Sequence, residues 1–158
     1  MSHVLLTPGG ELTRHDGEVD WPAAVGPEGR ARVSLMPSLA VAAYVNDCGH
    51  AFPDRYPRNI VGSALLAALG AVPRPYAGTI VFVGWNAANT ARGLLEIVPL
   101  QASLADAVAD VHADVRRALA GDPPRDMSPS WGEQMREIAE HARTAPTPTL
   151  TVRTVTRP

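Results

Sequence analysis

The 158-residue chain contains no lysine, only one cysteine, and no apolar run long enough to span a bilayer. All 14 basic residues are arginine, and alanine, proline and glycine are abundant, which indicates a GC-rich genome: a high-GC bacterium or one of its phages or plasmids. Because Cys48 stands alone, an internal disulfide and a zinc site with two or more thiolates are excluded. The N-terminal residues lack the pattern of a signal peptide, so we expect a cytoplasmic protein.

The chain also lacks a strong net charge and the common catalytic motifs. Its formal charge is -2 and only 19% of its residues are charged, so no large basic surface for nucleic acid or anionic lipid is expected. No P-loop, GxGxxG, HExxH or GxSxG pattern is present. We therefore expect no cofactor, and a function that is more readily explained by binding than by catalysis.

The first two thirds of the chain predict a sheet with two helices. Short β-rich or apolar runs predict strands at residues 3–6, 11–14, 31–36, 39–45, 79–85 and 94–100. Asp20 and Gly26 bracket a short helix over 21–25, and Asn59 is placed to cap a longer helix over 60–69. The nearly all-apolar run 39–45 predicts a strand that is covered on both faces.

The last third is predicted to be helical. Ser103 is placed to cap a helix with one apolar stripe, in which Asp106, Asp110 and Asp114 occupy the solvent side. Ser128 opens a second helix, in which we expect Arg136 and Glu140 to form an i,i+4 pair on the polar face. The two helices are expected to form a hairpin on the sheet.

The expected fold is α+β, with a mostly antiparallel sheet of five to seven strands, one packed central helix and a C-terminal helical hairpin. We divide the chain into an α+β core over residues 1–100, the hairpin over 101–145, and residues 146–158 as a tail or an added edge strand.

Residues 3–85 contain four short segments in a distinctive order: the strand and turn VLLTPGGEL, a strand ending in YVND, Asn59 before a small-residue helix, and the strand GTIVFVGW. This arrangement resembles a family of short uncharacterised proteins from actinobacteria, their phages and plasmids, known only as a domain of unknown function. The resemblance implies a small α+β fold and a mobile-element context, and it supplies no catalytic residue. The segment DCGHAFPDRYPR is longer and more charged than its counterpart in the family, and the C-terminal third lies outside the resemblance.

The loop between the strand over 39–45 and the helix at Asn59 carries the densest group of chemically capable side chains. We predict an anion- or partner-binding site formed by Asp47, His50, Asp54, Arg55, Tyr56, Arg58 and Asn59. Two guanidiniums beside a helix N-terminus suit a phosphate or carboxylate. The simpler alternative is that Asn59 only caps its helix while Arg55 and Arg58 pair with Asp47 and Asp54.

Two further hypotheses concern the same loop. Cys48, His50 and Asp54 could form a nucleophilic site, but residues two apart on a turn rarely hold a thiol and an imidazole in hydrogen-bond geometry. Asp47, His50 and Asp54 could bind a metal weakly. We expect neither a catalytic nor a metal site, and interpret the loop mainly as a solvated polar segment.

Two polar patterns outside the loop also allow both a functional and a purely structural interpretation. Asn86, Asn89 and Arg92 form an amide-rich connection that could read a ligand, and the aspartate row 106–114 could mimic phosphates. A hairpin connection and a solvated helix face are the simpler explanations.

The sequence thus favours a non-enzymatic interaction protein that binds, and by hypothesis inhibits, a host protein. The alternative is a small enzyme or an anion- or nucleotide-binding protein that uses residues 47–59. We expect no nucleic-acid or membrane partner, and the sequence leaves a homo-oligomer open.

Overall fold

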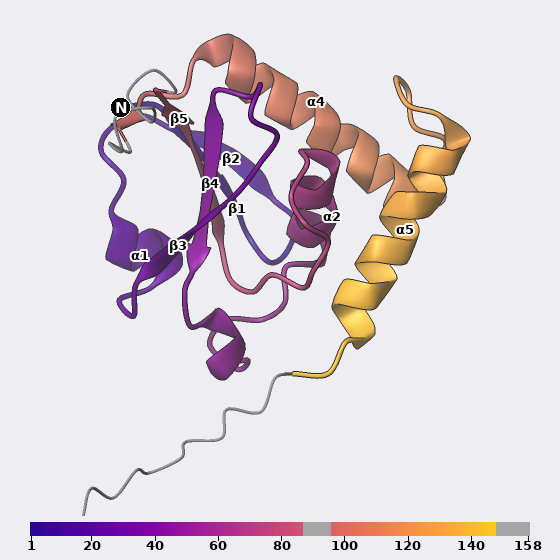
Figure 1. Cartoon of the computed structure of the whole chain (residues 1–158), viewed down its shortest axis with the longest axis horizontal. Coiled ribbons are helices and arrows are strands. Elements are labelled where there is room, and N and C mark those ends of the chain that lie inside the picture. Colours follow the sequence, from indigo (N-terminus) through magenta and orange to yellow (C-terminus); the bar gives the residue numbers. More distant parts are fainter. Residues whose placement is uncertain (87–95, 148–158) are drawn as a thin grey trace, which may run out of the picture.

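The computed structural model describes residues 1–86 and 96–147, which form a six-stranded antiparallel sheet flanked by helices (Figure 1). The strands are β1 (His3–Leu6), β2 (Leu12–His15), β3 (Arg30–Val33), β4 (Val41–Asn46), β5 (Ile80–Trp85) and β6 (Ile97–Val98). Their order is β2-β1-β5-β4-β3, and β6 pairs with the C-terminal part of β5. The predicted mixed fold with a mostly antiparallel sheet is confirmed.

The two central strands, β4 and β5, are covered on both faces, as the apolar run of β4 predicted. Every residue of β4 is buried, and the first four residues of β5 are completely inaccessible. Alternate side chains of these strands enter two separate apolar clusters on opposite faces of the sheet. The sheet is therefore the middle layer of the molecule.

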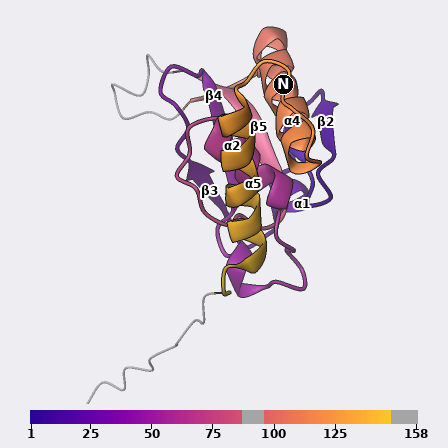
Figure 2. The same ribbon diagram turned by 90° about the vertical axis from the view of Figure 1, so that its right-hand side faces the viewer.

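The larger helices cover one face and a single short helix covers the other (Figures 1 and 2). Helices α2 (Ile60–Ala68), α4 (Ala102–Leu119) and α5 (Pro129–Thr144) pack together and share the larger apolar cluster with the sheet. Helix α1 (Trp21–Val25) contacts β4 and β5 on the opposite face. A 3-10 turn, η1 (Gly49–Ala51), lies in the loop after β4. None of the helices in the described part of the chain has the length and hydrophobicity of a membrane-spanning segment.

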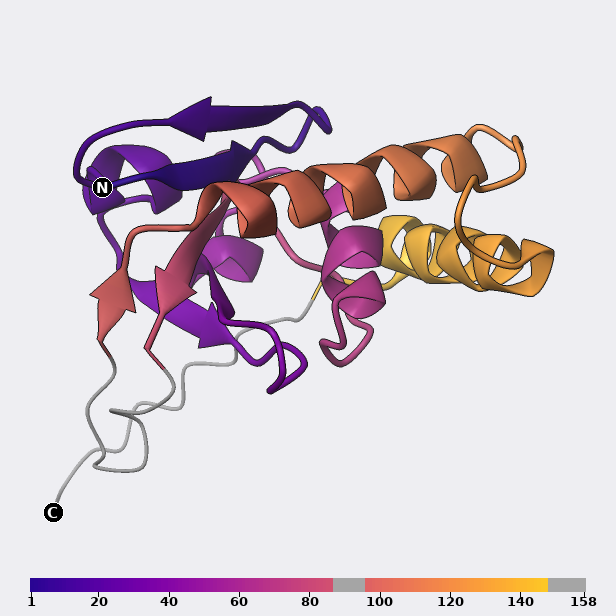
Figure 3. The ribbon, with the colours of Figure 1, turned by 90° about the horizontal axis from the view of Figure 1, so that it is seen from above.

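Helices α4 and α5 form the expected hairpin, which lies alongside β1, β2 and α2 when viewed from above (Figure 3). Helix α4 begins at Ala102, so the prediction that Ser103 caps it is wrong, and the N-cap residue makes no side-chain hydrogen bond. Ser128 does cap α5: its hydroxyl oxygen accepts a hydrogen bond from the backbone N–H of Trp131. The cap of α5 was recognisable because Pro129 fixes where that helix starts.

The polar faces of the hairpin differ from the prediction at two places. Asp114 is only 3% exposed, because the connection between the helices folds back over it and the N–H of Arg125 donates a 2.9 Å hydrogen bond to its carboxylate. The predicted Arg136–Glu140 pair is also absent. Arg136 donates to the carbonyl of Ala118 in α4, and Glu140 pairs with Arg143. Arg136 thus contacts the other helix, whereas Glu140 finds a different partner within α5.

Several expected elements are shorter than their sequence signal. The strand predicted over 31–36 ends at Val33, where the chain leaves β4. The strand predicted over 94–100 is described only as Ile97–Val98, and it pairs antiparallel with β5 as expected. Asn89 and Arg92, and the tail from residue 148 onward, lie outside the described residues.

Candidate functional site

The loop predicted to bind an anion or a partner is attached to the segment before β3 through one carboxylate, that of Glu28. This side chain accepts hydrogen bonds from the Arg55 guanidinium at 2.6 Å, the Tyr56 hydroxyl at 2.5 Å and the Asn46 amide at 3.1 Å. Donation by Tyr56 is the main cause that lowers the pKa of Glu28, and the same bond raises the pKa of Tyr56. Arg55 therefore pairs with Glu28, and not with Asp47 or Asp54 as the simpler alternative expected.

Gly26 leaves the space in which this network forms. Its backbone φ of +111° is rarely adopted by residues that have a side chain, and an added Cβ would lie 2.2 Å from the Tyr56 hydroxyl. The glycine expected to end α1 thus has a second role, which is to let the loop approach the helix.

Arg58 points to a different part of the fold. Its guanidinium donates to the carbonyls of Ala142 and Arg143 at 2.8 and 3.2 Å, and lies 3.5 Å from the hydroxyl of Thr147. These carbonyls end helix α5, where a cation is favoured because the last carbonyls of a helix have no partner within it. The structure therefore does not bring Arg55 and Arg58 together on one ligand position.

Asn59, the remaining member of the predicted site, is completely buried. Its side chain accepts the N–H of Gly62 and donates to the carbonyls of Leu6 and Gly78. The predicted N-cap of α2 is confirmed, and the same amide also joins the helix to β1 and to the residues before β5. This helix start is inside the protein and does not face solvent.

The reactive side chains of the loop remain separate. Cys48 and Asp54 are exposed, and no hydrogen bond joins either of them to His50 in the described part of the chain. Burial is the main cause that lowers the pKa of His50, aided by the charges of Arg58 and Arg74, while a hydrogen bond with the Pro75 carbonyl acts in the opposite direction. Across residues 1–86 and 96–147, no three His, Cys, Asp or Glu side chains come together as a metal site.

A second candidate site lies along the edge strand β3. In the described residues this strand pairs only with β4, and only over Arg30–Val33. Beyond Val33 the chain diverges from β4, so Val41 and Ala42 pair with β5 but have no strand partner on their outer side in the part of the chain that the structure describes. Among residues 1–86 and 96–147 the sheet therefore ends in an open edge, which is the backbone surface that an added strand requires.

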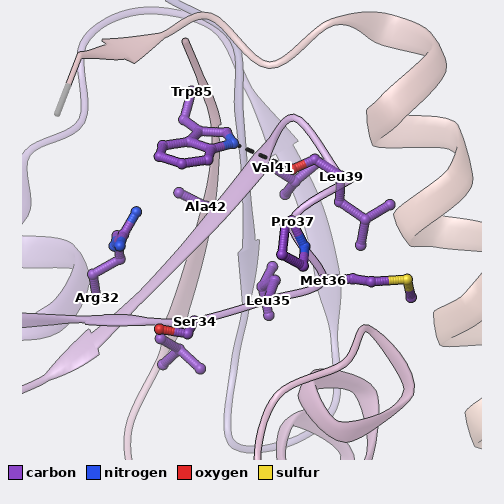
Figure 4. A pocket seen from close by; sticks show the side chains of 10 residues that line it. Arg32, Ser34, Leu35, Met36, Pro37, Leu39, Val41, Ala42 and Trp85 are labelled. Atoms are coloured by element: carbon purple, nitrogen blue, oxygen red, sulfur yellow. Dashed lines mark hydrogen bonds between the residues drawn. The ribbon is translucent and has the colours of Figure 1, made fainter. Parts of the chain in front are cut away.

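A groove opens where β3 and β4 diverge, and Figure 4 shows its lining. The groove has a volume of about 190 Å³. Its walls are mostly apolar and come from the chain after β3, the start of β4 and the end of β5, namely Arg32, Val33, Ser34, Leu35, Met36, Pro37, Leu39, Val41, Ala42 and Trp85. Ligand pockets for cofactors and drug-sized molecules usually measure 300–1,000 Å³. The groove is thus better matched to one large side chain than to a whole cofactor.

The groove has one rigid wall and one accessible wall. The indole N–H of Trp85 donates to the Leu39 carbonyl at 3.2 Å, which fixes the ring over the start of β4. On the opposite side Met36 is 46% exposed, and its backbone N–H is held by the carbonyl of Leu69 at the end of α2. The groove thus combines a fixed aromatic ring with an exposed, flexible thioether at its far rim, and such a surface suits side chains of varied shape.

Two arginines of β3 lie on the same face as helix α1 and stack on aromatic rings. The guanidinium carbon of Arg30 is 4.3 Å from the ring centre of Trp21, and that of Arg32 is 5.1 Å from the ring centre of Trp85. Trp21 in turn contacts Tyr44 edge to face and is partly buried against the smaller apolar cluster. Sequence reasoning did not single out β3, although alternating Arg30 and Arg32 in a short strand was the available signal.

Comparison with protein-family models, with curated proteins and with solved structures found no significant match. The function must therefore be inferred from the chain's own geometry.

Proposed function

We propose that the protein is a non-enzymatic binding module that takes an extended segment of a partner protein as an additional strand at the open edge formed by β3. The observation that carries this proposal is that the groove beside Trp85 adjoins a sheet edge with no partner strand among the described residues. Main-chain hydrogen bonds along such an edge supply affinity, and a pocket for a side chain supplies specificity. The partner expected from the sequence, a protein of the host cell, would be bound and by hypothesis inhibited in this way.

The other edge of the sheet supports binding less well. Strand β2 carries Arg14, which pairs with Asp106 of α4, and His15, which stacks on His3. Its polar side chains already contact neighbouring elements. Strand β3 combines an open backbone with exposed side chains and a groove, so we place the interface there.

The predicted anion site in the loop 47–59 remains a hypothesis with less support. Arg55 binds Glu28 and Arg58 binds the end of α5, so an anion would have to compete with existing contacts. The resemblance to the actinobacterial family also stays a prediction, as does the origin from a high-GC bacterium, phage or plasmid.

The test begins with affinity capture from an actinobacterial lysate, followed by hydrogen exchange on the purified complex. We expect amide protection at residues 30–36 and 41–42, with less change in the loop 47–59. A peptide spanning the bound segment should then lose affinity on N-methylation at alternate positions, because only alternate N–H groups of an added strand bond to the sheet. Protection confined to the loop, or equal tolerance of N-methylation at every position, would contradict strand addition.

A further inference from the structure

The arginines of β3 are held in place by the protein but are not neutralised by it. Contact with the rings of Trp21 and Trp85 orders the guanidiniums of Arg30 and Arg32. The N–H groups at the edge of each guanidinium remain available to donate hydrogen bonds. The ion pairs of the described residues are Arg14–Asp106, Arg55–Glu28 and Arg143–Glu140, so neither arginine of β3 has a carboxylate partner there. Both side chains are exposed.

We infer, on the basis of the proposed function, that the segment bound at β3 carries carboxylate side chains at two alternate positions, recognised by Arg30 and Arg32. The two arginines are two residues apart on one strand and therefore lie on one face of the sheet. An added strand has the same period of two residues, so its side chains on that face lie beside those of β3. Glutamate has the longer reach of the two acidic residues toward guanidiniums that lie over the sheet.

The residues on the other face of the added strand should be apolar. Ala31 and Val33 of β3 point to the side of the helical layer and belong to the large apolar cluster, and the groove lies next to them. The recognised segment is therefore extended, with acidic and apolar residues in alternation. One of the apolar side chains is expected to enter the groove on the side lined by Val33, Leu35 and Val41.

Charge argues against two other occupants of this edge. The tail over residues 148–158 contains two arginines and no acidic residue, so it would place like charges next to those of β3. A second copy of the chain, paired edge to edge through β3, would bring four arginines together. An acidic segment of a different protein avoids both conflicts.

The inference can be tested with defined peptides and ¹⁵N-labelled full-length protein. The probes are acetylated, amidated eight-residue peptides that alternate valine with glutamate, the same peptides with glutamine, and the same peptides with lysine. NMR titration detects weak binding and places it by shift changes at residues 30–36. We expect the glutamate peptide to bind about tenfold more tightly than the glutamine peptide at low salt, since an exposed charge pair is worth a factor of about three. The preference should largely disappear at 1 M salt.

Matched variants assign the preference to the two arginines. Arg30→Gln and Arg32→Gln should each reduce the affinity for the glutamate peptide about threefold and leave that for the glutamine peptide unchanged. Arg74→Gln is the control, because Arg74 also stacks on an aromatic ring, that of Tyr76, at 5.1 Å and lies elsewhere on the surface. Thermal unfolding of each variant establishes that the fold is retained.

The outcomes separate the inference from the proposed function. Equal binding of the glutamate and glutamine peptides at residues 30–36 would overturn the acidic preference and leave strand addition intact. Failure of every peptide to shift residues 30–36 would overturn both. Binding of an eight-nucleotide single-stranded oligothymidylate that is lost in Arg32→Gln, without peptide binding, would replace the protein partner by a nucleic acid.

Discussion

Replacing Asn59 by alanine or by aspartate would separate two roles of one buried side chain. As an N-cap, Asn59 accepts the N–H of Gly62 through Oδ1 at 2.8 Å. As a link across the fold, its Nδ2 donates to the carbonyls of Leu6 at 3.1 Å and Gly78 at 3.0 Å. Aspartate retains the first role and eliminates the second, whereas alanine eliminates both.

The expected magnitudes follow from these three hydrogen bonds. At about 1 kcal/mol of net stability for each bond, Asn59→Ala should lower the free energy of unfolding by about 3 kcal/mol. Asn59→Asp should cost at least as much at pH 7, because a carboxylate oxygen would face two carbonyl oxygens in a site without access to water. Domains of this size have a total stability of about 5–15 kcal/mol, so either variant should be visibly weakened.

Urea unfolding followed by far-UV circular dichroism measures both effects. The control is Asp20→Asn at the start of α1, where the exposed side chain accepts only from the N–H of Ala23. There the exchange should change stability by less than about 0.5 kcal/mol, since the two residues are equivalent caps. If Asn59→Asp were also within 0.5 kcal/mol of the wild type, capping would be its only role and our assignment of the network would be refuted. Lowering the pH should reduce the cost of Asn59→Asp, because protonation removes the buried charge.

Two further perturbations test other parts of the fold. Gly84→Ala would place a Cβ 2.5 Å from the Pro99 carbonyl oxygen, so we expect about 1–3 kcal/mol of destabilisation by thermal unfolding. The exposed Gly9→Ala is its control, and equal melting temperatures for the two variants would contradict the close approach of β5 and β6. His112 lies 3.0 Å from the Gly10 carbonyl, and burial is the main cause that lowers its pKa, with Arg116 adding to the effect and the carbonyl opposing it. Its contribution to stability is therefore complete above the unfolded pKa of about 6.5 and is lost as the pH falls below it. His112→Gln should lose less stability than the wild type between pH 7 and pH 5, and parallel urea-unfolding profiles would be inconsistent with this.

The sequence predicted elements well wherever a local signal defined both the element and its end. The Asn59 cap, the apolar run of β4 and the Ser128-Pro129 start of α5 each specify local geometry, and the structure has all three. The end of β3 was placed too late because Leu35 continues the apolar alternation although the chain has already left β4. Local propensity has no information about where a neighbouring strand stops.

Partner choice among charged side chains could not be predicted for the same reason. Arg55 had Asp54 beside it in the sequence, yet it binds Glu28, which is 27 residues away. Arg58 binds helix carbonyls 84 and 85 residues further along the chain. Exposed ion pairs between neighbours contribute little, so the long-range packing of β3, the loop and α5 decides which carboxylate or carbonyl each arginine reaches.

Because long-range packing decides these partners, the sequence pattern pointed to the loop as the binding site and not to β3. The loop has many ionisable groups, but its arginines and its tyrosine are engaged with Glu28 and with the end of α5. Strand β3 has only two ionisable groups, and they are conspicuous only once topology places them at an open edge beside a groove. Helix α1 is too short to cover the sheet face alone, so the stems of Arg30 and Arg32 and the rings below them complete the apolar layer. Arg30 and Arg32 therefore complete the packing of this face with their aliphatic stems and keep their charges available to a partner. Stability and recognition at β3 can be separated only by substitutions that retain the aliphatic stem and remove the charge.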